Sequence, residues 1–229
     1  MFPSTPGNEV PGAIAYVDPN FKMPQVWRSN VNAEFQLPYG FMLSVGAMYT
    51  RDIYNVVQKN MNEKAPSGTY NEQPGRVYWT KNNYYDNPKT KTVIQLTNGD
   101  EKGYQYSFNA VLTKKFDFGF TGSFGYTYTM AKDMTANPGS SAASVNDPGV
   151  SYSLFSTPHR LIANASYEVA YANMKTTVSL FYTGYQQGRF SYTYSNDMNG
   201  DGNYSDLMYV PASKEEMTFV DIKDKQNNV

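Results

Sequence analysis

The sequence lacks the residues that most enzymes and metal centres need. Its 229 residues include no cysteine and a single histidine, His159. The chain therefore forms no disulfide, no zinc–thiolate or iron–sulfur site, no thiol nucleophile and no multi-histidine metal site. Nothing in the sequence places an acid and a nucleophile beside His159, so we expect a structural role for this side chain and no enzymatic activity.

Charged side chains are also scarce, at 17% of the chain against about 25% in soluble domains. Lys and Arg number 19 and Asp and Glu number 20, which gives a formal net charge of −1. This balance argues against nucleic acid as a partner, because nucleic-acid-binding domains carry a basic surface. No apolar run reaches about 18 residues, so we expect no transmembrane helix.

Aromatic residues, in contrast, are abundant, with 21 Tyr and 13 Phe. Apolar and polar residues also alternate with a period of two, which is typical of β-strands with one apolar face. Between Trp27 and Leu37, for example, five of six odd positions are apolar and all five even positions are polar. The alternation predicts six long strands, at about 26–37, 41–58, 103–116, 118–131, 160–171 and 175–194.

The connections between these strands alternate in length. Short reversals lie near 38–40, 117–119 and 171–174, whereas long polar segments cover about 60–102, 132–159 and 195–215. Structureless loops of this length are uncommon in compact soluble domains. Outer-membrane barrels, however, alternate short periplasmic turns with long extracellular loops. The pattern predicts an all-β fold: an antiparallel up-and-down sheet that forms part of a transmembrane β-barrel, with about six to seven long strands in one unit, 1–229.

A soluble β-sandwich is the alternative that also alternates apolar and polar residues. Sandwich strands usually have about 5–6 residues, and aromatic residues here lie toward the strand ends, as in the girdles of membrane barrels. Single-chain barrels begin at about eight strands. The N-terminus shows no secretory signal and the C-terminus no aromatic final strand, so we expect the chain to be a consecutive slice of a larger barrel.

Several short motifs, in this order and spacing, resemble one family. They are Pro24-Gln25-Val26-Trp27, Leu37-Pro38-Tyr39-Gly40, Tyr54-Asn55-Val56, Lys102-Gly103-Tyr104, Gly125-Tyr126-Thr127-Tyr128, Phe155-Ser156-Thr157-Pro158-His159-Arg160 and the loop from Asp197 to Pro211. Together they cover most of 14–211 and resemble barrel segments of TonB-dependent outer-membrane receptors of Bacteroidetes, of the Oar-like and SusC-like type.

The resemblance implies a receptor in the outer membrane of a Gram-negative bacterium. Such a receptor has a barrel of about 22 strands, an N-terminal plug domain and energised uptake of a nutrient such as a glycan, a peptide or a siderophore. Its partners would be outer-membrane lipid, the rest of the barrel with its plug, the TonB complex, the nutrient and a surface lipoprotein. The present chain lacks the plug, so we expect no activity from it alone. The alternatives from other classes are a passive channel or structural barrel protein, and a soluble extracellular carbohydrate-binding β domain.

One loop has the spacing of a calcium site. Asp197, Asn199, Asp201 and Asn203 match the oxygen-ligand positions at the start of an EF-hand loop, with Gly202 at the turn. The glutamate expected at position 12 is replaced by Met208, and Asp206 could substitute for it. The alternative is a polar turn held by hydrogen bonds of Asx type. No other cofactor is expected.

Two further groups of residues are candidates for binding. Trp79, Tyr84 and Tyr85 lie in the first long loop, where their rings could stack on a sugar or clamp a peptide, or could pack the loop itself. Four charged residues fall on the polar face of the strands and would line the lumen, where they could contact a plug or be solvated: Arg28, Glu34, Arg160 and Glu168.

Overall fold

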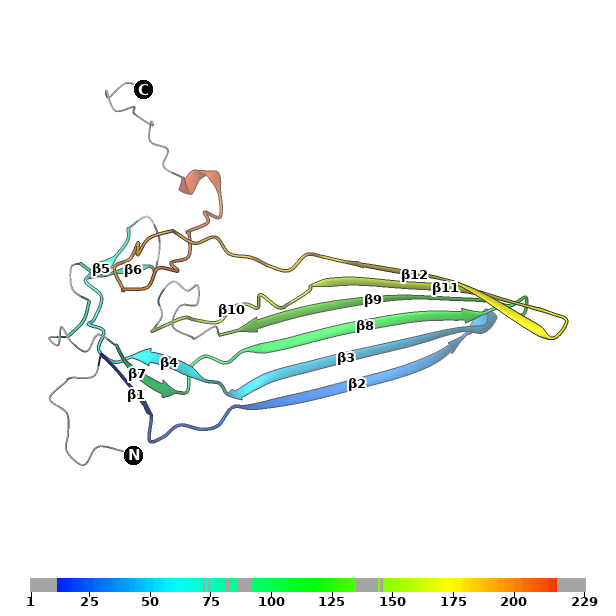
Figure 1. The fold of residues 1–229 in the computed structure, drawn as a ribbon, viewed down its shortest axis with the longest axis horizontal. Coiled ribbons are helices and arrows are strands. Elements are labelled where there is room, and N and C mark those ends of the chain that lie inside the picture. Colours follow the sequence, from blue (N-terminus) through cyan, green and yellow to red (C-terminus); the bar gives the residue numbers. More distant parts are fainter. Residues whose placement is uncertain are drawn as a thin grey trace, which may run out of the picture.

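Six long antiparallel strands dominate the computed structural model, which describes residues 12–71, 73, 75–80, 83–85, 92–134, 144 and 146–217. The strands lie side by side along the length of the molecule, as Figure 1 shows. They are β2 (Gln25–Leu37), β3 (Phe41–Tyr54), β8 (Tyr104–Lys115), β9 (Phe120–Asp133), β11 (His159–Tyr171) and β12 (Met174–Tyr185).

The strand order across the sheet is β12-β11-β9-β8-β3-β2, and every neighbouring pair is antiparallel. A short strand, β10 (Ser151–Tyr152), pairs with the loop end of β9 and makes the seventh member. This up-and-down order confirms the predicted fold class. Among the described residues, the outer edges of β2 and β12 pair with no further strand, so the sheet has two open edges.

Tight turns join the strands at one end of the sheet, at the right in Figure 1. The turn between β8 and β9 depends on Gly119, whose φ is +90°. Glycine adopts this conformation without the steric cost that a side chain brings. The Gly119 carbonyl accepts a 2.9 Å hydrogen bond from the Glu168 amide, and a Cβ at Gly119 would collide with the Glu168 carbonyl oxygen. The turn therefore packs closely against the neighbouring strand β11.

The long connections gather at the opposite end and contain small sheets of their own (Figure 1). One has the order β1-β7-β4, formed by β1 (Ala13–Val17), β7 (Thr92–Thr97) and β4 (Val57–Asn60), and its β1–β7 pair is parallel. The other is the β5–β6 pair, Gly68–Thr69 with Val77–Tyr78. A 3-10 turn, η2, covers Lys214–Glu216. No helix among the described residues has the length and apolar character to cross a membrane.

The predicted strand 41–58 is wrong at its end, because the structure divides it. β3 ends at Tyr54, opposite the first residue of β2, and β4 then joins the smaller sheet. Asn55 redirects the chain between the two: its side-chain amide donates to the Glu101 carbonyl, and its side-chain oxygen accepts from the Gly99 amide.

The predicted strand 175–194 is also too long, since β12 ends at Tyr185. Its partner β11 begins at His159, whose carbonyl accepts the last hydrogen bond from the Gln186 amide. Among the described residues no further strand of the sheet pairs with the chain beyond that point, and Thr193 instead forms an isolated bridge with Leu207. The segments predicted as loops at 60–102 and 132–159 contain β5, β6, β7 and β10, and parts of both lie outside the described residues.

Candidate functional site

The pairing register places most of the large apolar residues of the six long strands on one face, while a few, such as Met48, Val111 and Phe181, lie on the other. Ala47 of β3, for example, stands opposite Val31 of β2 and Phe108 of β8. Phe108 in turn stands opposite Tyr128 of β9. Directly opposite residues share a face of the sheet, so the alternation seen in each strand adds up to one broad apolar surface, called here the apolar face. Its other large members include Phe35, Leu43, Leu112, Phe124, Tyr126, Leu161, Tyr182 and Leu180.

The side chains of the apolar face are open to the surroundings. Val31 and Leu180 are each 72% exposed and Phe108 is 54% exposed. Monomeric soluble proteins rarely expose a continuous apolar patch larger than a few hundred Å². A surface that extends over six strands of 12 to 14 residues therefore requires an apolar environment such as the hydrocarbon layer of a membrane.

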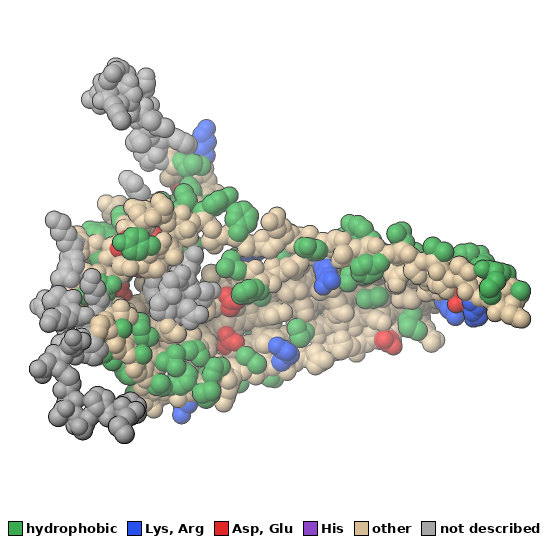
Figure 2. Space-filling model, viewed as in Figure 1, with side chains coloured by type: hydrophobic (Ala, Val, Ile, Leu, Met, Phe, Trp, Pro, Cys, Tyr) green, Lys and Arg blue, Asp and Glu red, His purple; other side chains and the backbone are tan. Residues whose placement is uncertain are grey.

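The opposite face of the sheet is mainly polar. Asn32, Gly46 and Asn109 form one cross-strand row on it. The charged residues predicted to line the lumen lie on this face too. Glu34 Oε1 accepts a hydrogen bond from the Ser44 hydroxyl at 3.2 Å, and Glu168 pairs with Lys175 at 3.0 Å. In Figure 2, charged side chains over the long strands are few and scattered.

Aromatic side chains collect at both ends of the apolar face. At the turn end, the rings of Phe116, Phe118 and Phe120 lie 5.2–6.2 Å apart, and Lys114 Nζ lies 4.5 Å from the Phe41 ring centroid. The loop end carries a second group: Trp27, Tyr49, Tyr104, Tyr106, Tyr128 and Tyr152. Aromatic side chains at both ends of the strands are typical of the girdles at the two interfaces of a membrane barrel, and further rings, such as Phe108 and Phe124, lie between the two groups.

His159 belongs to the loop-end aromatic group. Its Nδ1 lies 2.6 Å from the Tyr126 hydroxyl, and its ring packs 5.2 Å from the Tyr128 ring. The side chain thus ties the start of β11 to β9.

A second feature, called here the loop cluster, joins two long connections. It consists of the β5–β6 hairpin with the residues flanking it (63–71, 73, 75–80 and 83–85) and the segment 194–207. At its centre, Arg76 Nη2 lies 3.2 Å from Asp206 Oδ1, and these side chains are 7% and 1% exposed. Asp206 Oδ2 also accepts a 2.7 Å hydrogen bond from the Met198 amide, and Arg76 Nη1 donates to the Leu207 carbonyl. A buried ion pair with this many hydrogen bonds fixes the two segments to each other.

The aromatic residues predicted to bind substrate lie in this cluster, but they differ in exposure. Trp79 is only 9% exposed, its Nε1 donates to the Lys64 carbonyl at 2.7 Å, and its backbone amide donates to the Asn199 carbonyl at 2.7 Å. The structure therefore places Trp79 as a packing residue of the cluster, which corrects the idea of an open stacking platform. Tyr84 is half-buried, and Tyr85 is 56% exposed; substrate contact through Tyr85 stays a prediction.

The proposed calcium loop is held by hydrogen bonds to its own backbone. The two carboxylate oxygens of Asp197 accept from the Gly200 and Gly202 amides at 2.8 and 2.9 Å. Asp201 Oδ1 accepts from the Asn203 amide at 2.7 Å, and Asn199 Oδ1 from the Asp201 amide at 3.0 Å. This is the Asx-type arrangement that the sequence left open.

Within the described ranges, no group of three or more histidine, aspartate or glutamate side chains is arranged to hold a metal ion. Calcium binding stays a prediction. If it occurs, calcium titrated to millimolar concentration will protect the segment 195–215 from protease, and Asp197→Asn will remove the protection. Unchanged cleavage of the unaltered protein at millimolar calcium would contradict it.

Burial also perturbs acidic groups of the loop cluster. Burial, helped by the nearby Asp201 carboxylate, raises the pKa of Glu63 from 4.5 to about 7. Burial also raises the pKa of Asp201, against hydrogen bonds from Asn203 and Asn199 that lower it. Glu63 and Arg76 could not be recognised in the sequence, because the carboxylates beside them, Asp201 and Asp206, lie far away along the chain.

Comparison with known families adds an independent finding. A family model described as an outer membrane beta barrel domain matches residues 2–196. No curated protein and no solved structure matches the chain.

Proposed function

Because the chain belongs to the outer membrane beta barrel domain family, we propose that it forms part of the wall of a TonB-dependent receptor that takes up a nutrient. The family establishes an outer-membrane barrel protein. Energised uptake is a more specific proposal than a barrel in the outer membrane. It rests on the order and spacing of the receptor-like motifs between 14 and 211.

The apolar face supports the barrel part of this proposal. It matches a barrel wall whose outer side meets lipid and whose polar side faces a lumen. The open edges of β2 and β12 expose backbone donors and acceptors that lipid cannot satisfy. Further strands must therefore pair with them, and a receptor barrel of about 22 strands would supply these.

The loop cluster fits the same proposal. Loops at the mouth of a barrel are where a ligand first contacts the protein, and a cluster held by a buried ion pair can present exposed groups such as Tyr85 in a fixed geometry. The nutrient class stays open between glycans, peptides and siderophores. We propose no bond chemistry for the chain: its contribution is binding and gated passage.

A passive channel or a structural barrel protein is the alternative. It would share the apolar face but would need neither a plug nor an energy source. A soluble carbohydrate-binding domain does not fit a chain that belongs to an outer-membrane barrel family.

Uptake by the complete reading frame that contains this chain tests the proposal. Cells expressing it would be given labelled oligosaccharides, oligopeptides and ferric siderophores, with and without a protonophore. We expect accumulation of one class that stops when the proton gradient collapses, and a plug domain encoded upstream in the same frame. Uptake that persists with the protonophore, or a frame without a plug, would indicate the passive channel.

A further inference from the structure

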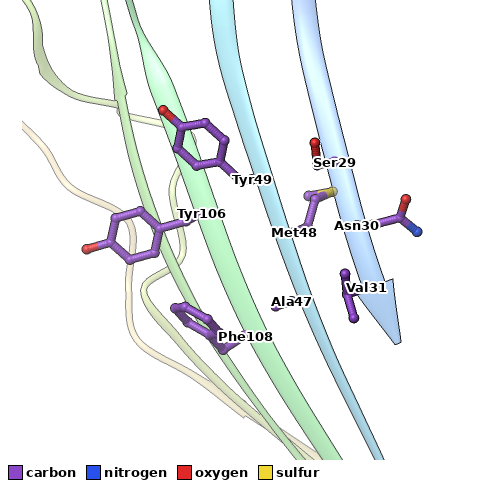
Figure 3. Close-up of a pocket in the computed structure, with 8 residues that line it drawn as sticks. All are labelled: Ser29, Asn30, Val31, Ala47, Met48, Tyr49, Tyr106 and Phe108. Atoms are coloured by element: carbon purple, nitrogen blue, oxygen red, sulfur yellow. The ribbon is translucent and has the colours of Figure 1, made fainter. Parts of the chain in front are cut away.

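The apolar face contains an open hollow. It has a volume of about 460 Å³ and lies over Ala47, with Val31, Tyr49, Tyr106 and Phe108 around it. In Figure 3 the rings of Tyr49, Tyr106 and Phe108 stand around the short side chain of Ala47. The hollow exists because a one-carbon side chain lies between large neighbours in the cross-strand row.

A second hollow of about 390 Å³ continues the first toward the turn end. The two share Val31, Ala47 and Phe108, and the second adds the small side chains of Ala33 and Val45. From the level of Tyr49 to that of Val45 is four residues of β3, or about 13 Å at about 3.3 Å per residue. Together the hollows form an elongated apolar groove parallel to the strands, on the face that meets lipid.

Cations lie beyond this groove toward the loop end of the same face, on β3 and on the neighbouring strand β9. The cross-strand row that follows Tyr49 and Tyr106 contains Arg51 of β3 and Lys132 of β9, with Tyr104 between them. Arg51 is two residues from Tyr49, or about 7 Å along the strand, and about 10 Å separates β3 from β9 across β8. The cations and the groove thus share one side of the sheet and follow each other along it.

A third cation comes from the segment after β12. Arg189 Cζ lies 3.9 Å from the Tyr152 ring centroid, and Lys132 Nζ lies 4.9 Å from the same centroid. Two positive charges therefore lie close to one ring. Among the described residues, the ion pairs are Arg76–Asp206 and Lys175–Glu168; none of the described carboxylates pairs with Arg51, Lys132 or Arg189.

We propose that this surface binds an anionic, phosphate-bearing lipid, with its headgroup on Arg51, Lys132 and Arg189 and one acyl chain in the groove below. Three cations without a carboxylate partner complement an anionic headgroup, and arginine forms bidentate hydrogen bonds with phosphate. The groove is continuous with the lipid-facing surface of the barrel. The proposal depends on the outer-membrane location and is independent of TonB coupling, so it can fail while energised uptake holds.

Native mass spectrometry of the complete protein in dodecyl maltoside would test this proposal. Dioleoyl phosphatidylglycerol is the probe, dioleoyl phosphatidylcholine is its matched lipid without net charge, and glycerol phosphate is the headgroup without a chain. We expect phosphatidylglycerol to bind at least tenfold more tightly than phosphatidylcholine, and glycerol phosphate not to displace it. Equal binding of the two lipids, or full displacement by glycerol phosphate, would overturn the proposal.

Variants separate the two halves of the site. Each of R51Q, K132Q and R189Q should weaken phosphatidylglycerol binding roughly fivefold. R160Q and K175Q, which change residues on the polar face, should not alter it.

The groove is tested separately. A47F fills the groove and should weaken the binding of both lipids, while A165F, on the same face but outside the groove, is its matched control. Arg189 lies in no strand, so R189Q keeps the test open if a strand variant does not fold. Unchanged binding by R189Q, or equal effects of A47F and A165F, would overturn the proposal.

Discussion

The Glu63 carboxyl group is an acidic group of the loop cluster whose pKa is raised to about 7. It is half-buried beside Asp201, and its Oε2 accepts a hydrogen bond from the Asn146 side chain. No cation is paired with it among the described residues. A carboxyl group in this setting is more stable when protonated, because burial penalises its charged form. At the scale of single residues, the loop cluster therefore responds to pH.

The pH response of Glu63 is a first prediction. Its folded-state pKa of about 7 lies above the usual 4.5, so the folded cluster binds an extra proton between these values. The stabilisation is complete below pH 4.5 and is lost as pH rises through 7. In a W27F background, Trp79 is the one remaining tryptophan, and its emission should shift to longer wavelength over this range. E63Q should flatten the profile; an unchanged pH profile in E63Q would contradict the assignment.

A second prediction at the residue scale concerns Gly119. Gly119→Ala places a side chain at φ +90° and against the Glu168 carbonyl oxygen. We expect the free energy of unfolding in detergent, measured with urea, to fall by about 1–3 kcal/mol. Gly188→Ala is the control, since Gly188 has no positive φ and its added Cβ would lie 3.5 Å from the Leu154 carbonyl oxygen, an ordinary contact. Equal effects of the two substitutions would show that the turn tolerates a side chain.

At the scale of elements, the β5–β6 hairpin and the segment after β12 behave as one unit. Arg76 and Asp206 are 130 positions apart in the chain. The Tyr70 hydroxyl reinforces their ion pair by donating to the Met198 carbonyl at 2.9 Å. Neither segment has a large apolar core of its own, because Val57 and Trp79 are the buried apolar residues of the whole described chain. The polar contacts therefore hold these elements together.

Breaking the ion pair should release both segments together. Arg76→Met leaves the Asp206 carboxylate buried without its partner, at a cost of about 3–5 kcal/mol. We expect protease to cleave both the β5–β6 hairpin and the segment 195–215 faster, while the six long strands stay folded. Lys175→Met, which removes an exposed pair, is the control and should change little. Cleavage of one segment without the other would show that they are not coupled.

The predictability of the fold follows the same division into elements. The long strands were predictable because most residues of β3, for example, indicate their face by their own polarity, with Met48 on the polar face and Arg51 on the apolar face as exceptions. Their ends were not: β3 stops at Tyr54 through side-chain bonds of Asn55 to residues more than 40 positions away. The burial of Trp79 was equally hidden, because its neighbour Asn199 arrives from another long connection. Local patterns specify elements, whereas contacts between connections depend on the whole chain.

At the scale of the whole molecule, the two faces of the sheet should meet different environments. The chain has no cysteine, so a cysteine introduced at one position is the one thiol of this chain that a maleimide can label. In the complete protein in outer membranes, a membrane-impermeant maleimide should label Ser44→Cys, on the polar face, at least tenfold faster than Val45→Cys, on the apolar face. Both positions lie on β3 and differ by one residue. Faster labelling at Val45 would reverse the assignment of the two faces.

The pairing register has a consequence for how this sequence can change during evolution. Side chains alternate between the faces with a period of two. The loss or gain of one residue within a strand would therefore move every following side chain of that strand to the opposite face. Changes of two residues would keep each side chain on its proper side. Across β2, β3, β8, β9, β11 and β12 we therefore expect natural insertions and deletions to come in even numbers, and odd ones to be confined to the connections.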